Sequence, residues 1–204
     1  MMFMDGTTLE SVVGRSLYKK VDQAMSERGI PGAVTMMMKP WAAMSFLSIP
    51  ENRSGTFMDM DLYNKAQAQG KERIGLEELS EQIAVFDGLS MKDQVILLKS
   101  SLSELKNIPR LIEALIQKYV TDDLNGLIRV SAKSMDSVSD KALIVSVMER
   151  LNDNRNVKMA RRLAPWLQKG NCFVAVGALH LTGAHGLIKL LRAKGYTVES
   201  ISRK

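Results

Sequence analysis

The segment from residue 173 to residue 198, which reads FVAVGALHLTGAHGLIKLLRAKGYTV, constrains the fold more than any other part of the chain. Residues 173–176 form a short apolar run typical of a buried strand, and Gly177 follows where the backbone turns or comes close to another part of the chain. Leucines at helical spacing come next, and residues 196–201 alternate as in a strand. The segment therefore predicts a strand, a loop, a helix and a second strand. His180 would stand at a strand's carboxyl end, where α/β proteins place their chemistry.

The remainder of the chain is predicted to be mostly helical. Apolar residues recur at steps of three and four from residue 90 to residue 105, and similar patterns continue to residue 170. A short strand is expected at residues 73–76. We therefore expect one domain over residues 1–204, of α/β (α+β) class. It would have a small sheet, a large inserted, predominantly helical subdomain at about 78–170, and a C-terminal strand-helix-strand unit at 172–202.

Composition excludes several classes of function. The 204 residues, 46% of them hydrophobic, suffice for a core of their own. The net charge of +6 comes from 28 basic residues scattered among 22 acidic ones, and the basic stretches lack interleaved aromatic residues, so we expect no nucleic-acid partner. No apolar run reaches the roughly 20 residues of a membrane span. The single cysteine, Cys172, cannot form an internal disulfide and is expected to be buried in its strand.

Several short motifs occur together along the chain. They are Lys39-Pro40-Trp41, Asp61-Leu62-Tyr63 with Gly70-Lys71, Gly75-Leu76-Glu77 with Glu81-Gln82, Asn154-Arg155-Asn156, and Gly177-Ala178-Leu179-His180. In combination they resemble the TraB/GumN family, which includes the Tiki proteases and is distantly related to erythromycin esterase and ChaN-like haem-binding proteins. The last motif resembles the second of the family's two G-x-x-H motifs. Trp41 is expected to be buried with its indole N–H hydrogen-bonded.

The first G-x-x-H motif of the family has no counterpart before Thr7, and the other histidine, His185, is not preceded by a glycine at the motif spacing. The resemblance therefore implies a family domain without its N-terminal part. If an export signal was lost with that part, a periplasmic or cell-envelope location is expected; if the chain is complete, a cytoplasmic one.

The resemblance implies roles for five residues. His180 is the candidate metal ligand, although a hydrogen-bonded histidine at a strand end is the structural alternative. Glu77 could act as a general base or ligand facing the same crevice, or simply stabilise the start of a helix. Arg155 could clamp a carboxylate or stabilise a developing oxyanion, or form an ion pair. Gly177 and Asn154 are motif residues, and Asn154 could also cap a helix. His185 is expected at the loop surface.

The function implied by the resemblance is metal-dependent hydrolysis of a peptide or amide bond, with Mn, Co or Zn as the ion. Because half of the family's site is missing from the sequence, we expect this chain alone to be inactive. One alternative is a binding protein that holds a peptide, another small molecule or haem without chemistry. Another is a structural domain that forms a homodimer through the surface left by the missing segment, where some of the 14 methionines would lie.

Overall fold

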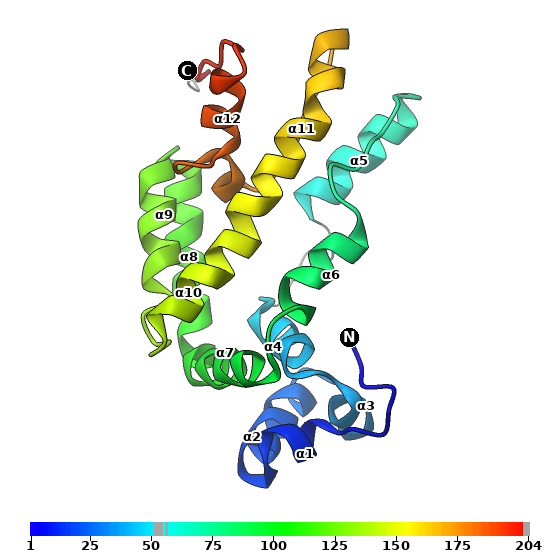
Figure 1. The fold of residues 1–204 in the computed structure, drawn as a ribbon, viewed down its shortest axis with the longest axis vertical. Helices are drawn as coiled ribbons and strands as arrows, with labels where there is room; N and C mark the ends of the chain where they lie inside the picture. Colours follow the sequence, from blue (N-terminus) through cyan, green and yellow to red (C-terminus); the bar gives the residue numbers. More distant parts are fainter. Residues whose placement is uncertain (51–54, 56, 202–204) are drawn as a thin grey trace. The chain divides into compact units, whose positions relative to one another are not determined.

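A computed structural model describes residues 1–50, 55 and 57–201 (Figure 1). Within these residues the regular structure is helical: no strand forms, and the single β-bridge pairs Met2 with Met38. The helices before residue 105 are α1 (Leu9–Val13), α2 (Arg15–Ser26), α3 (Gly32–Met37), α4 (Pro40–Ser48), α5 (Met58–Ala68), α6 (Leu79–Asp87) and α7 (Met91–Glu104). The later ones are η1 (Leu105–Asn107), α8 (Ile108–Val120), α9 (Leu124–Lys133), α10 (Lys141–Met148), η2 (Glu149–Asp153), α11 (Asn154–Lys169), η3 (Ala178–Leu181) and α12 (Leu187–Ala193).

The predicted α/β class with a small sheet is therefore wrong. The three expected strands, at residues 73–76, 173–176 and 196–201, are neither helical nor paired with one another in the described chain. A strand is stable only when its backbone groups find a neighbouring strand, and an apolar run cannot show whether that neighbour exists. Phe173, expected in the core, is 80% exposed, and Cys172, expected to be buried, is exposed as well.

The chain divides into two compact units. Unit 1 comprises Met1–Glu51, Leu79–Gln117 and Val130–Ile144, and its core gathers where α4 packs against α7. Its most deeply buried side chains include Leu9, Val21, Met25, Leu47 and Leu98.

Trp41 anchors this core as the sequence predicted. It is 4% exposed, and its indole Nε1–H donates to Asp87 Oδ1 over 2.8 Å. The same oxygen accepts from Lys39 Nζ at 2.7 Å, and the Trp41 ring stacks on Phe86 with ring centres 6.2 Å apart. The Lys39-Pro40-Trp41 motif is thus part of the packing of unit 1.

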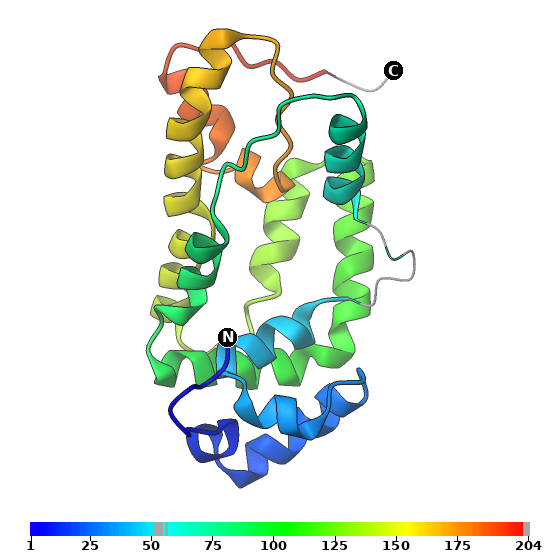
Figure 2. The same cartoon turned by 90° about the vertical axis from the view of Figure 1, so that its right-hand side faces the viewer.

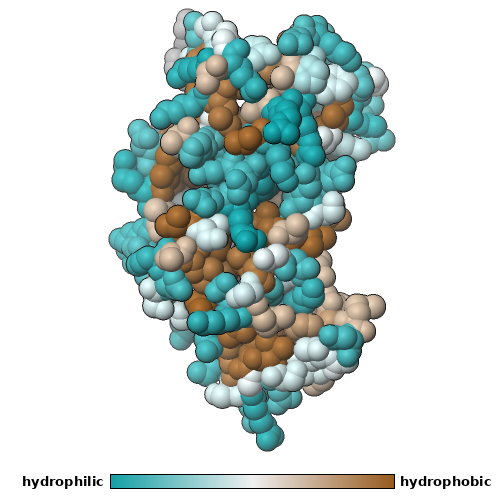
Figure 3. All heavy atoms as spheres, in the orientation of Figure 1, coloured by the Kyte–Doolittle hydropathy of each residue, from teal (hydrophilic) through white to brown (hydrophobic). Residues whose placement is uncertain are grey.

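Unit 2 comprises Asn52–Glu78, Lys118–Arg129 and Val145–Lys204, and α11 is its central element. Figures 1 and 2 show α12 alongside α11, and the buried residues between them recur at helical spacing. They are Met159, Ala160 and Leu163 of α11 and Leu187 of α12. The outward face of α11 is polar, as the teal band over this helix in Figure 3 shows. The helix therefore has one face for packing and others that can carry polar contacts.

The non-helical segment before Glu77 is fastened to α11 by a side chain rather than by a strand ladder. Arg162 Nη1 donates to the Leu76 carbonyl over 2.8 Å. The segment after α12 contacts the same helix, where the Tyr196 hydroxyl donates to the Ala164 carbonyl at 3.5 Å. One side chain of α11, Arg162, and the hydroxyl of Tyr196 thus hold two of the segments that the sequence predicted as strands. No helix among the described residues is long and apolar enough to cross a membrane.

Candidate functional site

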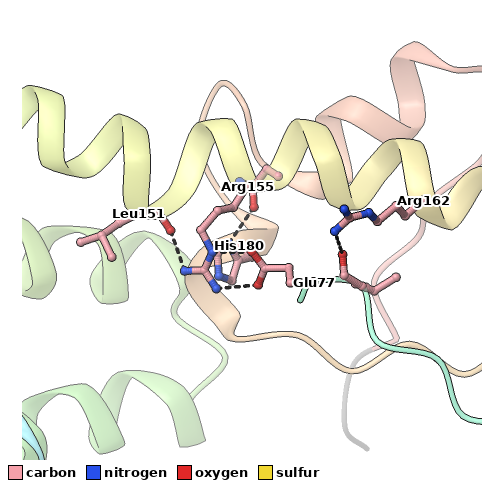
Figure 4. A network of polar contacts seen from close by, with 7 residues as sticks. Glu77, Leu151, Arg155, Arg162 and His180 are labelled. Carbon is pink, nitrogen blue, oxygen red and sulfur yellow. Dashed lines mark hydrogen bonds and ion pairs between the residues drawn. The ribbon is translucent and has the colours of Figure 1, made fainter. Parts of the chain in front are cut away.

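Arg155, in the first turn of α11, forms a two-point ion pair with Glu77. Its Nε donates to Glu77 Oε1 and its Nη2 to Glu77 Oε2, each at a distance of 2.7 Å, while Nη1 donates to the Leu151 carbonyl at 2.9 Å (Figure 4). The Glu77 side chain is only 8% exposed and that of Arg155 21%. This geometry matches a planar guanidinium to both oxygens of a carboxylate, the strongest form of such a pair. It also uses three of the five N–H groups of the guanidinium, which leaves two.

His180 lies beside this pair, in the short helix η3 (Figure 4). Its Nδ1 shares a hydrogen bond of 2.7 Å with Asn156 Oδ1, whereas Nε2 has no hydrogen-bond partner in the described part of the chain. Partial burial lowers the pKa of His180 below its ordinary value of 6.5; the nearby Arg155 cation lowers it further and the Glu77 carboxylate opposes both. The ring is thus held largely neutral near pH 7, the state in which imidazole binds a metal.

The loop that carries His180 is fixed to the start of α11 by further contacts. Asn152 Nδ2 donates to the Leu179 carbonyl at 3.3 Å, and Asp153 Oδ2 lies 3.0 Å from Nδ1 of His185. Asn152 and Asp153 belong to η2, a π-helical turn directly before α11. Such turns are rare and occur frequently at functional sites. The sequence prediction that His185 is a surface residue is confirmed, since its side chain is 59% exposed.

Whether these residues could hold a metal depends on the number of ligands. A catalytic zinc site has about three protein ligands and an open position for water. Within the described residues, no three His, Cys, Asp or Glu side chains gather closely enough to hold a metal ion. His180 offers one free nitrogen, and both oxygens of Glu77 already accept from Arg155. The described residues alone therefore do not form a complete metal centre.

Asn154 and Gly177, the two motif residues, make few contacts in the candidate site. Asn154 is exposed, makes no side-chain hydrogen bond within the described chain, and does not cap the helix, because η2 runs directly into α11. Gly177 has φ −57°, a conformation open to any residue, and a Cβ there would meet only His180 Cδ2, at 3.6 Å. Neither position requires its residue type for backbone geometry.

Sequence reasoning missed Asn156, which contacts His180 directly and is fully buried. A signal was available: Asn156 continues the spacing of Met159, Ala160 and Leu163, so it is a polar residue on the apolar face of its helix. A polar side chain in such a position must find partners inside the protein.

Comparison with known proteins settles the family. The model of the TraB/PrgY/gumN family matches residues 1–200 of this chain. The chain belongs to the TraB/PrgY/gumN family. The resemblance carried by the sequence motifs is thus confirmed. No solved structure matches the chain significantly.

Curated relatives of this TraB/PrgY/gumN family member are named metalloproteases. Metalloprotease TIKI2 of Danio rerio is 27% identical over 193 residues, covering 78% of this chain and 36% of the relative. Metalloprotease TIKI2 of Xenopus tropicalis is 23% identical and covers 97% of this chain and 47% of the relative, and metalloprotease TIKI1 of Homo sapiens is 24% identical with 78% and 37% covered. The chain therefore spans less than half the length of each of these relatives.

Proposed function

We propose that this chain supplies part of the site of a metal-dependent hydrolase of peptide or amide bonds, with His180 Nε2 as one metal ligand. The supporting observation is the free Nε2 of a neutral ring beside the Arg155–Glu77 pair, in a family with relatives named metalloproteases. Mn, Co and Zn are the candidate ions; bound beside a scissile carbonyl, such an ion would supply a Lewis acid or an activated water. The other ligands would have to come from outside the described residues.

Arg155 is proposed to bind the substrate, and Glu77 to hold Arg155. Glu77 accepts from the guanidinium through both oxygens, so it fixes the plane in which the two remaining N–H groups point. Those groups could donate to a substrate carboxylate, or to a carbonyl oxygen as negative charge develops on it. Gly177 and Asn154 are proposed to do no more than shape the surrounding loop and the start of α11.

The experiment is a titration of this protein with Mn²⁺, followed in the NMR signals of its two histidine rings. Paramagnetic broadening of the His180 ring at Mn²⁺ concentrations that leave His185 sharp is the expected result, and Zn²⁺ should compete. The His185→Ala variant should retain the broadening of His180. Broadening that is confined to His185, or none in the millimolar range, would overturn the metal role.

Two alternative functions remain predictions from the sequence. Haem binding would give a shift of the Soret band that depends on His180 or His185. A homodimer would appear in light scattering as a mass of twice 22.7 kDa that resists dilution. Neither result is required by the site described above.

A further inference from the structure

Asn156 stands between the His180 ring and the backbone of the loop that carries it. It is fully buried, its Nδ2 lies 2.9 Å from the His185 carbonyl oxygen, and its Oδ1 lies 2.7 Å from His180 Nδ1. A carbonyl oxygen can only accept a hydrogen bond, so the amide nitrogen, not the amide oxygen, must face His185. The orientation of the Asn156 amide is thereby determined.

The same logic extends to the histidine. With Nδ2 facing His185, the atom that faces His180 is the amide oxygen, which again can only accept. Nδ1 of His180 must therefore carry the hydrogen. The opposite amide orientation would set the Asn156 side-chain oxygen against the His185 carbonyl oxygen and leave both acceptors without this hydrogen bond, at a cost of about 1–3 kcal/mol for each buried group.

We infer that Asn156 is a positioning residue that holds neutral His180 in the Nδ1–H tautomer and leaves the lone pair on Nε2. A neutral histidine side chain in water favours the other tautomer, with the hydrogen on Nε2 and no lone pair there. Asn156 thus supplies a preference that the ring itself lacks. The role of this tautomer, which is to present Nε2 to a metal, rests on the proposed function. The tautomer itself does not depend on that function.

His185 provides an internal comparison. Its Nδ1 also faces an acceptor, Asp153 Oδ2 at 3.0 Å, but the two side chains are 59% and 37% exposed. Water competes with an exposed contact of this kind, whereas Asn156 is fully buried and its contact with His180 is partly shielded from water. A change at Asp153 should therefore alter the environment of His185 and leave the tautomer of His180 unchanged.

The test uses the whole chain labelled with ¹⁵N in histidine only, which gives two rings and four ring nitrogens. Long-range ¹H–¹⁵N spectra are recorded at about pH 8.5, roughly two units above the ordinary histidine pKa. We expect a protonated-type shift for Nδ1 and an unprotonated-type shift for Nε2 of His180. In Asn156→Leu, of similar size but without hydrogen bonds, we expect His180 to move towards the Nε2–H pattern. In the control, Asp153→Asn, His180 should keep its wild-type shifts.

Either of two results would overturn the inference. One is a wild-type His180 with its hydrogen on Nε2, which needs no variant and so is independent of whether Asn156→Leu folds. The other is a folded Asn156→Leu protein whose His180 keeps the wild-type pattern; methyl spectra of the Met159 and Leu187 region establish that it is folded. Because no metal is added, a correct tautomer with no Mn²⁺ binding would refute the proposed function alone.

Discussion

Arg155 should contribute more to the stability of unit 2 than any single neutral hydrogen bond can. Replacing it by Met keeps much of the side-chain volume but removes two charge-assisted hydrogen bonds from Glu77, whose side chain is 8% exposed. Removing one partner of a buried ion pair costs about 3–5 kcal/mol because the other charge stays buried. Since the Arg155 side chain is 21% exposed, water can reach part of the space it vacates. We therefore expect a loss of about 2–4 kcal/mol from Arg155→Met.

The matched control is Arg161→Met, on the same helix. The Arg161 side chain is exposed and makes no hydrogen bond or ion pair with the described residues, and such a surface substitution usually changes the free energy of unfolding by no more than about 0.5 kcal/mol. Unfolding in urea can be followed through Trp166 of α11 if all variants carry Trp41→Phe, because the chain has two tryptophans. If Arg155→Met is no more destabilising than Arg161→Met, the reasoning about the buried pair is refuted.

A double-mutant cycle would separate the pair from its surroundings. Glu77→Leu alone should be destabilising because it leaves the Arg155 cation without its carboxylate. Combined with Arg155→Met, the losses should fall short of additivity by at least about 1 kcal/mol, as is usual for residues in direct contact. Additive losses would mean that the two side chains contribute through separate contacts.

The remaining predictions concern pH and the loop glycines. NMR titration should place the pKa of His180 below 6.5. The unfolded chain then binds the proton more readily than the folded one, so the free energy of unfolding should fall as the pH drops below 6.5. This dependence of stability on pH should be weaker in His180→Gln. The hydrogen bond from Lys39 holds the pKa of Asp87 below 3.8, so the ionised Asp87 should stabilise the fold above that pH and lose this effect as the pH falls further. Asp87→Asn should lack this loss of stability when acid unfolding is followed by Trp fluorescence. A Cβ at Gly186 would clash with the backbone carbonyl of Thr182, so Gly186→Ala should cost about 1–3 kcal/mol in urea unfolding, and Gly177→Ala should cost far less.

The sequence predicted the helices and one side-chain environment well. Periodic apolar residues located α7, and the burial and indole hydrogen bond of Trp41 are as expected. Boundaries were less accurate. The Thr7-Thr8-Leu9-Glu10 spacing predicts a capping box at Thr7 and one helix from there to Arg28, but in the structure Thr8 caps α1, and Gly14, with φ 81°, separates α1 from α2. Helical periodicity fixes which face is buried, but a single residue at positive φ decides where the helix ends.

The strands could not have been judged from the sequence alone. The run at residues 173–176 has strand composition, yet strand formation depends on hydrogen bonds to residues far away in the chain. The candidate site also depends on a contact between residues far apart in the sequence. Glu77 and Arg155 were each assigned a role, but only the fold shows that they bind each other across 78 positions of sequence.

The structure of α11 explains why one helix can organise the whole candidate site. Arg155 and Arg162 are seven residues apart, close to two helical turns, so they lie on one face and both reach the segment that contains Leu76 and Glu77. Asn156 is one residue further round and belongs to the face that packs against α12 and faces the His180 loop. A rotation of α11 about its axis would therefore displace both the Arg155 guanidinium and the Asn156 amide that contacts the His180 imidazole. A site built on a packed helix in this way keeps its two polar groups in register without a sheet to support them.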